Sequence, residues 1–373
     1  MASVIIARSR AFTPSVDRFA LALADQGHHV VVLRWNRDGR ASSRFSERVK
    51  FMYFNLRAPY DQLHAALVQP FWQFYLFKVL IGADVDIMHA CDLDTLLPAL
   101  VASRVRGKKL LYTVYDFYAD NLPIGVPSSL RNLVARLERL CISWVDWLFL
   151  VNEDQIRQVG LPAPKRISVV YNSPRDARER PRTSGQTPRN DGGRFLLYYA
   201  GNLHKSRGLG YAIEAVSTLP ACEIELAGTG PDEIRLRKLA GSLGGHVSFD
   251  GLQPYESVID HSLRADAVFA FYDPAIPSNR YASPNKLFEA MMCGKPFLTN
   301  AGTYAARLVT QEGCGLTIPY GDVESIRQSV IRLRNNPALC EELGTRGRRA
   351  YEERYSWAEM EQRIAKSYRE VMR

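Results

Sequence analysis

The segment from Ser283 to Asn300, SPNKLFEAMMCGKPFLTN, has residue types and spacing that suit anion binding. Ser283 is a favourable N-cap residue, and Pro284 suits the first helical position, where its missing amide proton costs nothing. Apolar residues at helical spacing then predict a buried face, and Gly294 predicts the end of the helix before a strand. A helix that begins at the carboxyl end of a strand binds anions through free amide groups and its positive dipole end.

Glu289 extends this chemistry along the same predicted helix. It follows Ser283 by six residues, which is about 9 Å along the axis at about 1.5 Å per residue. A phosphate at the helix start and a ribose near Glu289 would match the span of a nucleoside diphosphate. A structural helix with a surface glutamate explains this segment alone equally well.

Two further strand-to-helix junctions suit a phosphorylated ligand. In YYAGNLHKSRGLGYAIEAV, a strand ends at Ala200 and a loop carries Lys205 and Arg207, which can bind a diphosphate. In ELAGTGPDEIRLRKLA, Gly228 and Gly230 allow close approach of a ligand to the backbone, although a tight turn explains them equally well.

These segments belong to a regular alternation of short apolar runs and helical patterns. The runs are ASVIIAR, HVVVLRW, VKFMYFN, VDIMHA, KLLYTVY, WLFLV and RISVVY in the first half, then FLLYYAG, EIELAG, HVSFDG, AVFAFY, PFLTN and GLTI. Strands that are apolar nearly throughout predict parallel sheets covered on both faces. The segment 172–194 is rich in Pro, Gly, Ser, Thr and Arg, which predicts a linker between two α/β domains. We expect a ligand in the cleft between them.

The composition narrows the class of protein. The 373 residues, 46% hydrophobic and 23% charged, are enough for two globular domains. The six cysteines stand singly, which suits a reduced compartment and argues against a zinc site. The net charge of +9 favours anionic lipid or phosphorylated small molecules, since no nucleic-acid-binding motif is present. A solubilising surface charge explains it equally well.

No apolar run is long enough for a signal peptide or a membrane span; the best one, PFWQFYLFKVLIG, is interrupted by Gln73 and Lys78. The helical pattern RNLVARLERLCISWVDW combines arginines and leucines and predicts either a packed surface helix or a basic amphipathic contact with a membrane. The arginines are expected opposite the leucines; they are Arg131, Arg136 and Arg139, and the leucines are Leu133, Leu137 and Leu140. We expect a cytoplasmic protein, with peripheral association at the inner face of a membrane as an alternative.

In their order and spacing, these segments resemble the family 4 retaining glycosyltransferases with the GT-B fold. The resemblance includes the loop after FLLYYAG, the G-x-G-P turn, VSFDG and EAMMCGKP. It extends to the tail YSWAEMEQRIAKSYREVM and, in the first half, to GHHVVVL and IMHACDLDTLLPAL.

The family's fold consists of two facing Rossmann-like domains with parallel sheets and an interdomain cleft. The resemblance implies an acceptor domain at 1–172, a linker at 173–194 and a nucleotide-sugar domain at 195–355. The C-terminal helix, 356–373, is expected to pack back on the first domain.

The resemblance also assigns residues to the donor. Arg207 matches the family's phosphate-binding lysine, Glu289 matches a glutamate that binds the ribose hydroxyls, and the helix start from Ser283 to Lys286 faces the phosphates. The full donor set is Gly201, Asn202, Lys205, Gly228, Gly230, Tyr281, Ser283, Pro284, Asn285, Lys286, Leu287 and Glu289.

Three positions depart from the family pattern. Asn202 replaces an arginine that binds phosphate, with Lys205 as a substitute, and Tyr281 replaces the first glutamate of a pair. Tyr115 replaces a histidine in the first domain, although the following acid, Asp116, is present. With His89, at the end of a predicted strand, Tyr115 and Asp116 are the catalytic candidates on the acceptor side, and Arg207 is the candidate on the donor side.

The activity implied is transfer of a sugar, with retention, from a nucleotide diphosphate sugar to a glycan or lipid-linked acceptor, with neither metal nor cofactor. The motifs DVD (84–86) and DLD (92–94) resemble the metal-binding D-x-D of another glycosyltransferase fold. However, acids are expected where DLD opens a helix. Two alternatives stay open: a nucleotide-sugar epimerase or hydrolase on the same fold, and a catalytically weak scaffold, which the departures favour.

Overall fold

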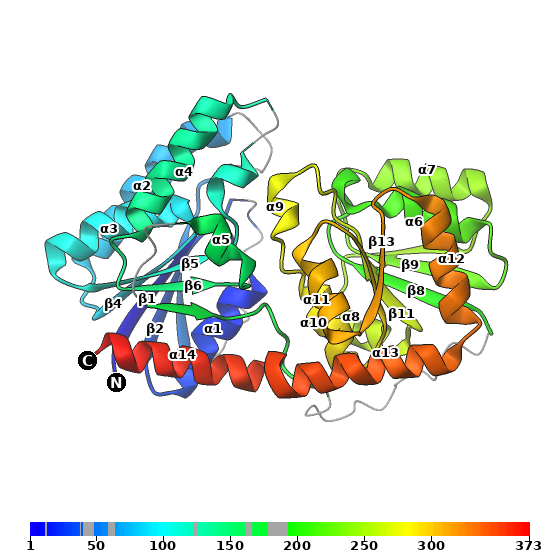
Figure 1. The fold of residues 1–373 in the computed structure, drawn as a ribbon. Helices are drawn as coiled ribbons and strands as arrows, with labels where there is room; N and C mark the ends of the chain where they lie inside the picture. Colours follow the sequence, from blue (N-terminus) through cyan, green and yellow to red (C-terminus); the bar gives the residue numbers. More distant parts are fainter. Residues whose placement is uncertain are drawn as a thin grey trace. The chain divides into compact units, whose positions relative to one another are not determined.

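The computed structural model describes residues 1–11, 13–37, 39, 48–58, 64–122, 125–160, 166–177 and 193–373, without the side chains of 64–66. The chain divides into two compact units (Figure 1). Unit 1 comprises Met1–Tyr171 with Met360–Arg373, and unit 2 comprises Asn172–Glu359. Most of the expected linker, residues 178–192, lies outside the described residues.

Unit 1 contains a seven-stranded parallel sheet in the order β3-β2-β1-β4-β5-β6-β7. Its strands are β1 (Ser3–Arg8), β2 (His29–Trp35), β3 (Val49–Phe54), β4 (Ile87–Cys91), β5 (Lys109–Val114), β6 (Trp147–Leu150) and β7 (Ile167–Val169). Every strand expected in this half is confirmed. The central strands are buried along nearly their whole length because helices cover both faces of the sheet.

The helices of unit 1 are α1 (Pro14–Asp25), α2 (His64–Gly82), α3 (Leu93–Arg106), α4 (Ser128–Ile142), α5 (Asp154–Val159) and the end of α14 (Trp357–Val371). Alternate residues of a strand point to opposite faces of the sheet. Met88 and Tyr112 therefore pack into one core with α2, α3 and α4. On the opposite face, His89 contacts Phe19 of α1 and Tyr368 of α14.

Unit 2 contains a six-stranded parallel sheet in the order β10-β9-β8-β11-β12-β13. Its strands are β8 (Phe195–Ala200), β9 (Cys222–Ala227), β10 (Val247–Gly251), β11 (Ala267–Ala270), β12 (Phe297–Asn300) and β13 (Gly315–Ile318), again as expected. Its helices are α6 (Leu209–Ser217), α7 (Glu233–Leu243), α8 (Tyr255–Arg264), α9 (Pro277–Arg280), α10 (Asn285–Cys293), α11 (Tyr304–Glu312), α12 (Val323–Arg334) and α13 (Pro337–Ala350). A π-helical turn, Tyr351–Tyr355, separates α13 from α14. The sequence thus correctly predicted two Rossmann-like α/β units.

Neighbouring parallel strands end at the same edge of a sheet. In unit 2, β8 lies between β9 and β11, so the loops that follow these strands meet at one edge. The predicted donor residues of the β8 and β9 loops are therefore brought together by the sheet order.

Candidate functional site

The loops after β8 and β9 are bonded to each other through their backbones. The amide of Leu203 donates to the carbonyl of Thr229 (3.0 Å), and the amide of Asp232 donates to the carbonyl of Leu203 (3.0 Å). A Cβ at Gly228, where φ is +123°, would lie 1.9 Å from the carbonyl oxygen of Gly201. The close contact between the two loops therefore explains why position 228 requires a glycine. Gly230 is constrained in the same way, since a Cβ there would lie 2.3 Å from the carbonyl oxygen of Leu203.

Arg207 ends a 3₁₀ turn, Lys205–Arg207, between β8 and α6. Its Nη1 donates to the Oδ1 of Asn279 (3.2 Å), and its guanidinium lies 4.4 Å from the ring centroid of Tyr272. Asn279 is itself fixed, because its side-chain amide donates to the carbonyl of Asp273 (2.9 Å). The half-buried Arg207 is thus held in place by a ring and an amide, whereas Lys205 is exposed to solvent.

The helix expected to begin at Pro284 begins one residue later, at Asn285, so the prediction of Ser283 as its N-cap was wrong. Pro284 occupies the N-cap position with extended backbone (φ −72°, ψ 128°), and no side chain caps the helix. The Oγ of Ser283 is buried without a hydrogen-bond partner. The first amides of α10 consequently lack the side-chain acceptor that a serine cap would supply, which leaves them available to an anion. The predicted end at Gly294 is confirmed, with φ +65°.

Lys286, in the first turn of α10, reaches the loop after β8. Its Nζ lies 4.7 Å from the ring centroid of Tyr199, and a Cβ on Gly201 would lie 2.6 Å from that nitrogen. Glu289 follows one turn later and is 94% buried, with a relative exposure of 6%. An ammonium group, a helix N-terminus and a glycine of the β8 loop therefore lie together. We call the loops 201–208 and 228–232 and the first turn of α10 the unit 2 site.

Two of the three positions that depart from the family pattern, Asn202 and Tyr281, belong to unit 2, and Asn202 lies within its site. Asn202 is exposed, and its carbonyl accepts a hydrogen bond from the hydroxyl of Tyr199 (2.8 Å). A Cβ on Gly230 would lie 2.4 Å from the side-chain oxygen of Asn202, so this amide packs on the β9 loop. Tyr281 is half-buried and occupies the C-cap position of α9.

His89 lies in the core of unit 1 with an exposure of 2%. Its Nδ1 is hydrogen-bonded with the hydroxyl of Tyr368 (2.7 Å) and its Nε2 with that of Thr113 (2.7 Å). Burial lowers the pKa of His89 to about 3, so the ring stays neutral. Because both ring nitrogens are engaged inside the core, His89 joins the sheet to α14, and this placement argues against the catalytic role considered above.

Tyr115 and Asp116 follow β5 and are fixed by Asp92, which sequence reasoning had not selected for this purpose. The carboxylate of Asp92 accepts hydrogen bonds from the amides of Tyr115 (2.9 Å) and Asp116 (3.3 Å) and pairs with the buried Arg8. Asp92 has φ +65°, a conformation that only a few per cent of non-glycine residues adopt. The sequence offered one indication that Arg8 has a role at this place, namely that a charged residue ends the apolar run ASVIIAR.

The DLD motif belongs to this same group. Asp92 is engaged by Arg8 and two amides, and burial raises the pKa of Asp94 to about 6. In DVD, a side-chain oxygen of Asp86 accepts from the amide of Ser3 (2.9 Å), and Asp84 pairs with Lys108 (4.0 Å). Asp84, Asp86 and Asp92 thus each have a partner within unit 1.

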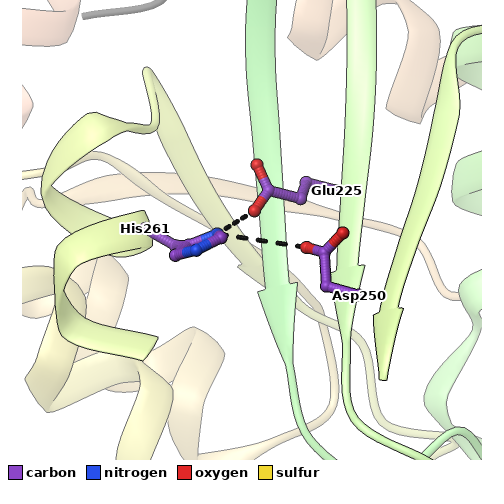
Figure 2. Close-up of side chains that lie close together, drawn as sticks. All are labelled: Glu225, Asp250 and His261. Atoms are coloured by element: carbon purple, nitrogen blue, oxygen red, sulfur yellow. Dashed lines mark hydrogen bonds and ion pairs between the residues drawn. The ribbon is translucent and has the colours of Figure 1, made fainter. Parts of the chain in front are cut away.

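Among the described residues, Glu225, Asp250 and His261 form a group with the spacing of metal ligands (Figure 2). His261 of α8 contacts the carboxylate of Glu225 and lies 3.9 Å from that of Asp250, on the neighbouring strand β10. Arg264 donates to the second oxygen of Glu225 (2.7 Å) and lies 3.1 Å from the Nδ1 of His261. A guanidinium thus already supplies a positive charge here, and the group ties α8 to the sheet.

Comparisons with known proteins agree with this architecture. A family model described as Glycosyltransferase Family 4 matches residues 14–173, and one described as Glycosyl transferases group 1 matches residues 180–350. EpsD of Bacillus subtilis (strain 168), named as a glycosyltransferase, is 27% identical over 312 residues, covering 79% of this chain and 77% of EpsD.

Two solved structures share the fold over nearly the whole chain. Sucrose-phosphate synthase from Thermosynechococcus elongatus has a TM-score of 0.79 at 17% identity, covering 100% of this chain and 99% of that one. HepE from Anabaena, solved in complex with UDP-glucose, has a TM-score of 0.76 at 16% identity, covering 99% and 100%.

Two Rossmann-like units with these matches define a glycosyltransferase of GT-B architecture. The chain belongs to family 4 of the glycosyltransferases.

Proposed function

We propose that the unit 2 site binds the diphosphate of a nucleotide sugar and that the enzyme transfers the sugar, with retention and without a metal ion, to a glycan or lipid-linked acceptor. The observation that carries this proposal is the meeting of Lys286, the uncapped start of α10 and the β8 loop. A helix N-terminus with an adjacent ammonium group suits a phosphate in both charge and geometry. HepE, which has the same fold, binds UDP-glucose.

The charged residues in and beside the unit 2 site each have a role in this proposal. Lys286 and the amides of Asn285 and Lys286 hold one phosphate, and Arg207 of the β8 loop holds the other, with Lys205 in support. Glu289, one turn further along α10, accepts hydrogen bonds from the ribose hydroxyls. As the bond between the sugar and the phosphate breaks, negative charge builds on the departing diphosphate, and the fixed cations and amides stabilise that charge.

Unit 1 supplies the acceptor side, with Tyr115 and Asp116 as candidates to contact the acceptor hydroxyl. Both are half-buried at the carboxyl end of β5, and the pairing of Asp92 with Arg8 fixes their backbone. A lipid-linked acceptor would bring the enzyme to a membrane surface, and we propose peripheral contact with anionic lipid on this basis.

The experiment is calorimetric titration with uridine diphosphate and guanosine diphosphate. Lys286→Met should weaken binding of the preferred nucleotide at least about tenfold, because a hydrogen bond to a charged group contributes about 1.5–3 kcal/mol. Lys238→Met, an exposed lysine of α7, is the matched control and should bind as the wild type does. Equal affinities in a folded Lys286→Met variant would place the phosphates elsewhere.

The departures at Asn202 and Tyr281 favour one competing function, a scaffold that binds donor without turnover. A third possibility, an epimerase or hydrolase, would release product without any acceptor. Measuring nucleoside diphosphate release with and without candidate acceptors separates a transferase, whose release depends on the acceptor, from a hydrolase, whose release does not, and from a scaffold, which releases none. An epimerase is identified by conversion of the nucleotide sugar to its isomer without any acceptor.

A further inference from the structure

The α4 helix exposes leucines on its outward surface, in addition to the residues of its inward surface that pack on unit 1. Ala135, Glu138 and Ile142 are buried, whereas Leu133, Leu137 and Leu140 are exposed. At about 100° per residue, this exposed stripe lies about 180° around the helix from the buried one. The two flanking arginines do not share that outward surface. Arg131 donates to the carbonyl of Ala119 (2.6 Å) and Arg139 to that of Val159 (2.7 Å).

Two further helices on the same side of the sheet, α2 and α3, also bury one apolar stripe and expose another. On α2, Trp72 and Leu76 are buried, while Phe71 and Phe74 are 63% and 70% exposed. On α3, which contacts both α2 and α4, Leu97, Val101 and Val105 are exposed in one stripe. Figure 1 shows α2, α3 and α4 together on one side of unit 1. We call the exposed stripes of these three helices the α2–α4 face.

The exposed charged residues of these helices are all cations. Lys78, Arg104, Arg106 and Arg136 are exposed. The acids of the three helices are Asp94, which is half-buried, and Glu138, which is fully buried and accepts a hydrogen bond from the hydroxyl of Tyr112 (2.8 Å). Exposed apolar stripes on helices whose exposed charges are all cations are complementary to an anionic bilayer, whose acyl boundary takes the apolar side chains and whose headgroups attract the cations.

We infer that the α2–α4 face docks on an anionic phospholipid membrane, with the leucines and phenylalanines inserted at the level of the headgroups. A second copy of the chain is a poorer occupant, because a two-fold contact would place the same cations opposite each other. None of the helices in the described parts of the chain could span a bilayer. This inference deepens the proposed function, since it names the surface that would present the enzyme to a lipid-linked acceptor.

The test is co-sedimentation of the whole protein with vesicles of phosphatidylglycerol and phosphatidylcholine, compared with phosphatidylcholine alone. We expect binding to the anionic vesicles at low salt that falls as salt rises. The variants Phe71→Ser/Phe74→Ser and Leu133→Ser/Leu137→Ser should each weaken binding at least about tenfold. Lys78→Gln/Arg136→Gln should weaken it by about fivefold for each cation removed.

The matched control is Ile234→Ser/Leu252→Ser, which removes two apolar side chains of unit 2 that are 85% and 75% exposed. It should bind vesicles as the wild type does. Equal loss in this control, or no binding by the wild type at low salt, would overturn the inference. So would a wild-type dimer, seen by light scattering, that only the face variants convert to monomers. Affinity for uridine or guanosine diphosphate, titrated without vesicles, should be unchanged in the face variants, so failure of the docking surface is distinguishable from failure of the donor site.

Discussion

The substitution Gly228→Ala tests whether the β8 and β9 loops build the unit 2 site as one body. The new Cβ would lie 1.9 Å from the carbonyl oxygen of Gly201. The loops must separate by roughly 1 Å, because carbon–oxygen contacts below about 3 Å are strongly repulsive. The bonds at stake include Leu203 to Thr229 (3.0 Å) and Gly201 to Ala227 (2.8 Å).

The expected cost follows from these contacts. Each strained hydrogen bond contributes about 0.5–1.5 kcal/mol, and an alanine at positive φ adds about 1–2 kcal/mol. We therefore expect unit 2 to lose about 2–4 kcal/mol of unfolding free energy. A shift of about 1 Å in the loop that carries Arg207 should also weaken the contact of Arg207 with a nucleoside diphosphate and reduce the affinity at least about tenfold, since a hydrogen bond to a charged group contributes about 1.5–3 kcal/mol.

Gly244→Ala is the matched control, because Gly244 ends α7 with φ +66° and a Cβ there would meet nothing within 4 Å. Urea unfolding and calorimetry of both variants, at a temperature where both are folded, measure the difference. Nucleotide affinity in Gly228→Ala equal to that in Gly244→Ala would refute the coupling of the two loops to the site.

Two other substitutions test individual carboxylates. Glu289→Ala should weaken nucleoside diphosphate binding by about 1.5–3 kcal/mol if Glu289 holds the ribose, and calorimetry that finds no change in a folded variant would remove that role. Burial raises the pKa of Glu138 from 4.5 to about 8, so the folded state keeps a proton that the unfolded state releases, and stability should fall as pH rises through this window. Glu138→Gln should lack this fall, and urea unfolding at a series of pH values measures it; parallel pH profiles of wild type and variant would show that Glu138 titrates normally.

Local sequence patterns predicted the strands and the C-terminal end of α10 because burial on both faces and a glycine at positive φ leave signatures within a few residues. Contacts between residues far apart in the sequence leave no such local signature. The pairing of Arg8 with Asp92 joins the ends of two strands, and the core position of His89 depends on Tyr368, at the far end of the chain.

The α4 helix illustrates a second limit. Its periodicity identified two faces, but the expectation that arginines and leucines would form opposite surfaces missed which one faces outward. Arg131 and Arg139 turn inward because backbone carbonyls of neighbouring loops accept their protons. Ser283 failed as a cap for a similar reason: the extended backbone of Pro284 delays the helix, and a local rule does not contain that dihedral angle.

The central claim is that fixed cations of the unit 2 site stabilise the departing diphosphate, and the most direct measurement is the rate of nucleoside diphosphate release by Arg207→Ala with donor and acceptor present. Removing one electrostatic donor of this kind typically lowers turnover about 100- to 1000-fold. We expect that fall in kcat with a smaller change in KM, while Arg237→Ala, on the exposed surface of α7, should match the wild type. Normal turnover by Arg207→Ala, beside an active wild type, would contradict the placement of the diphosphate at this loop.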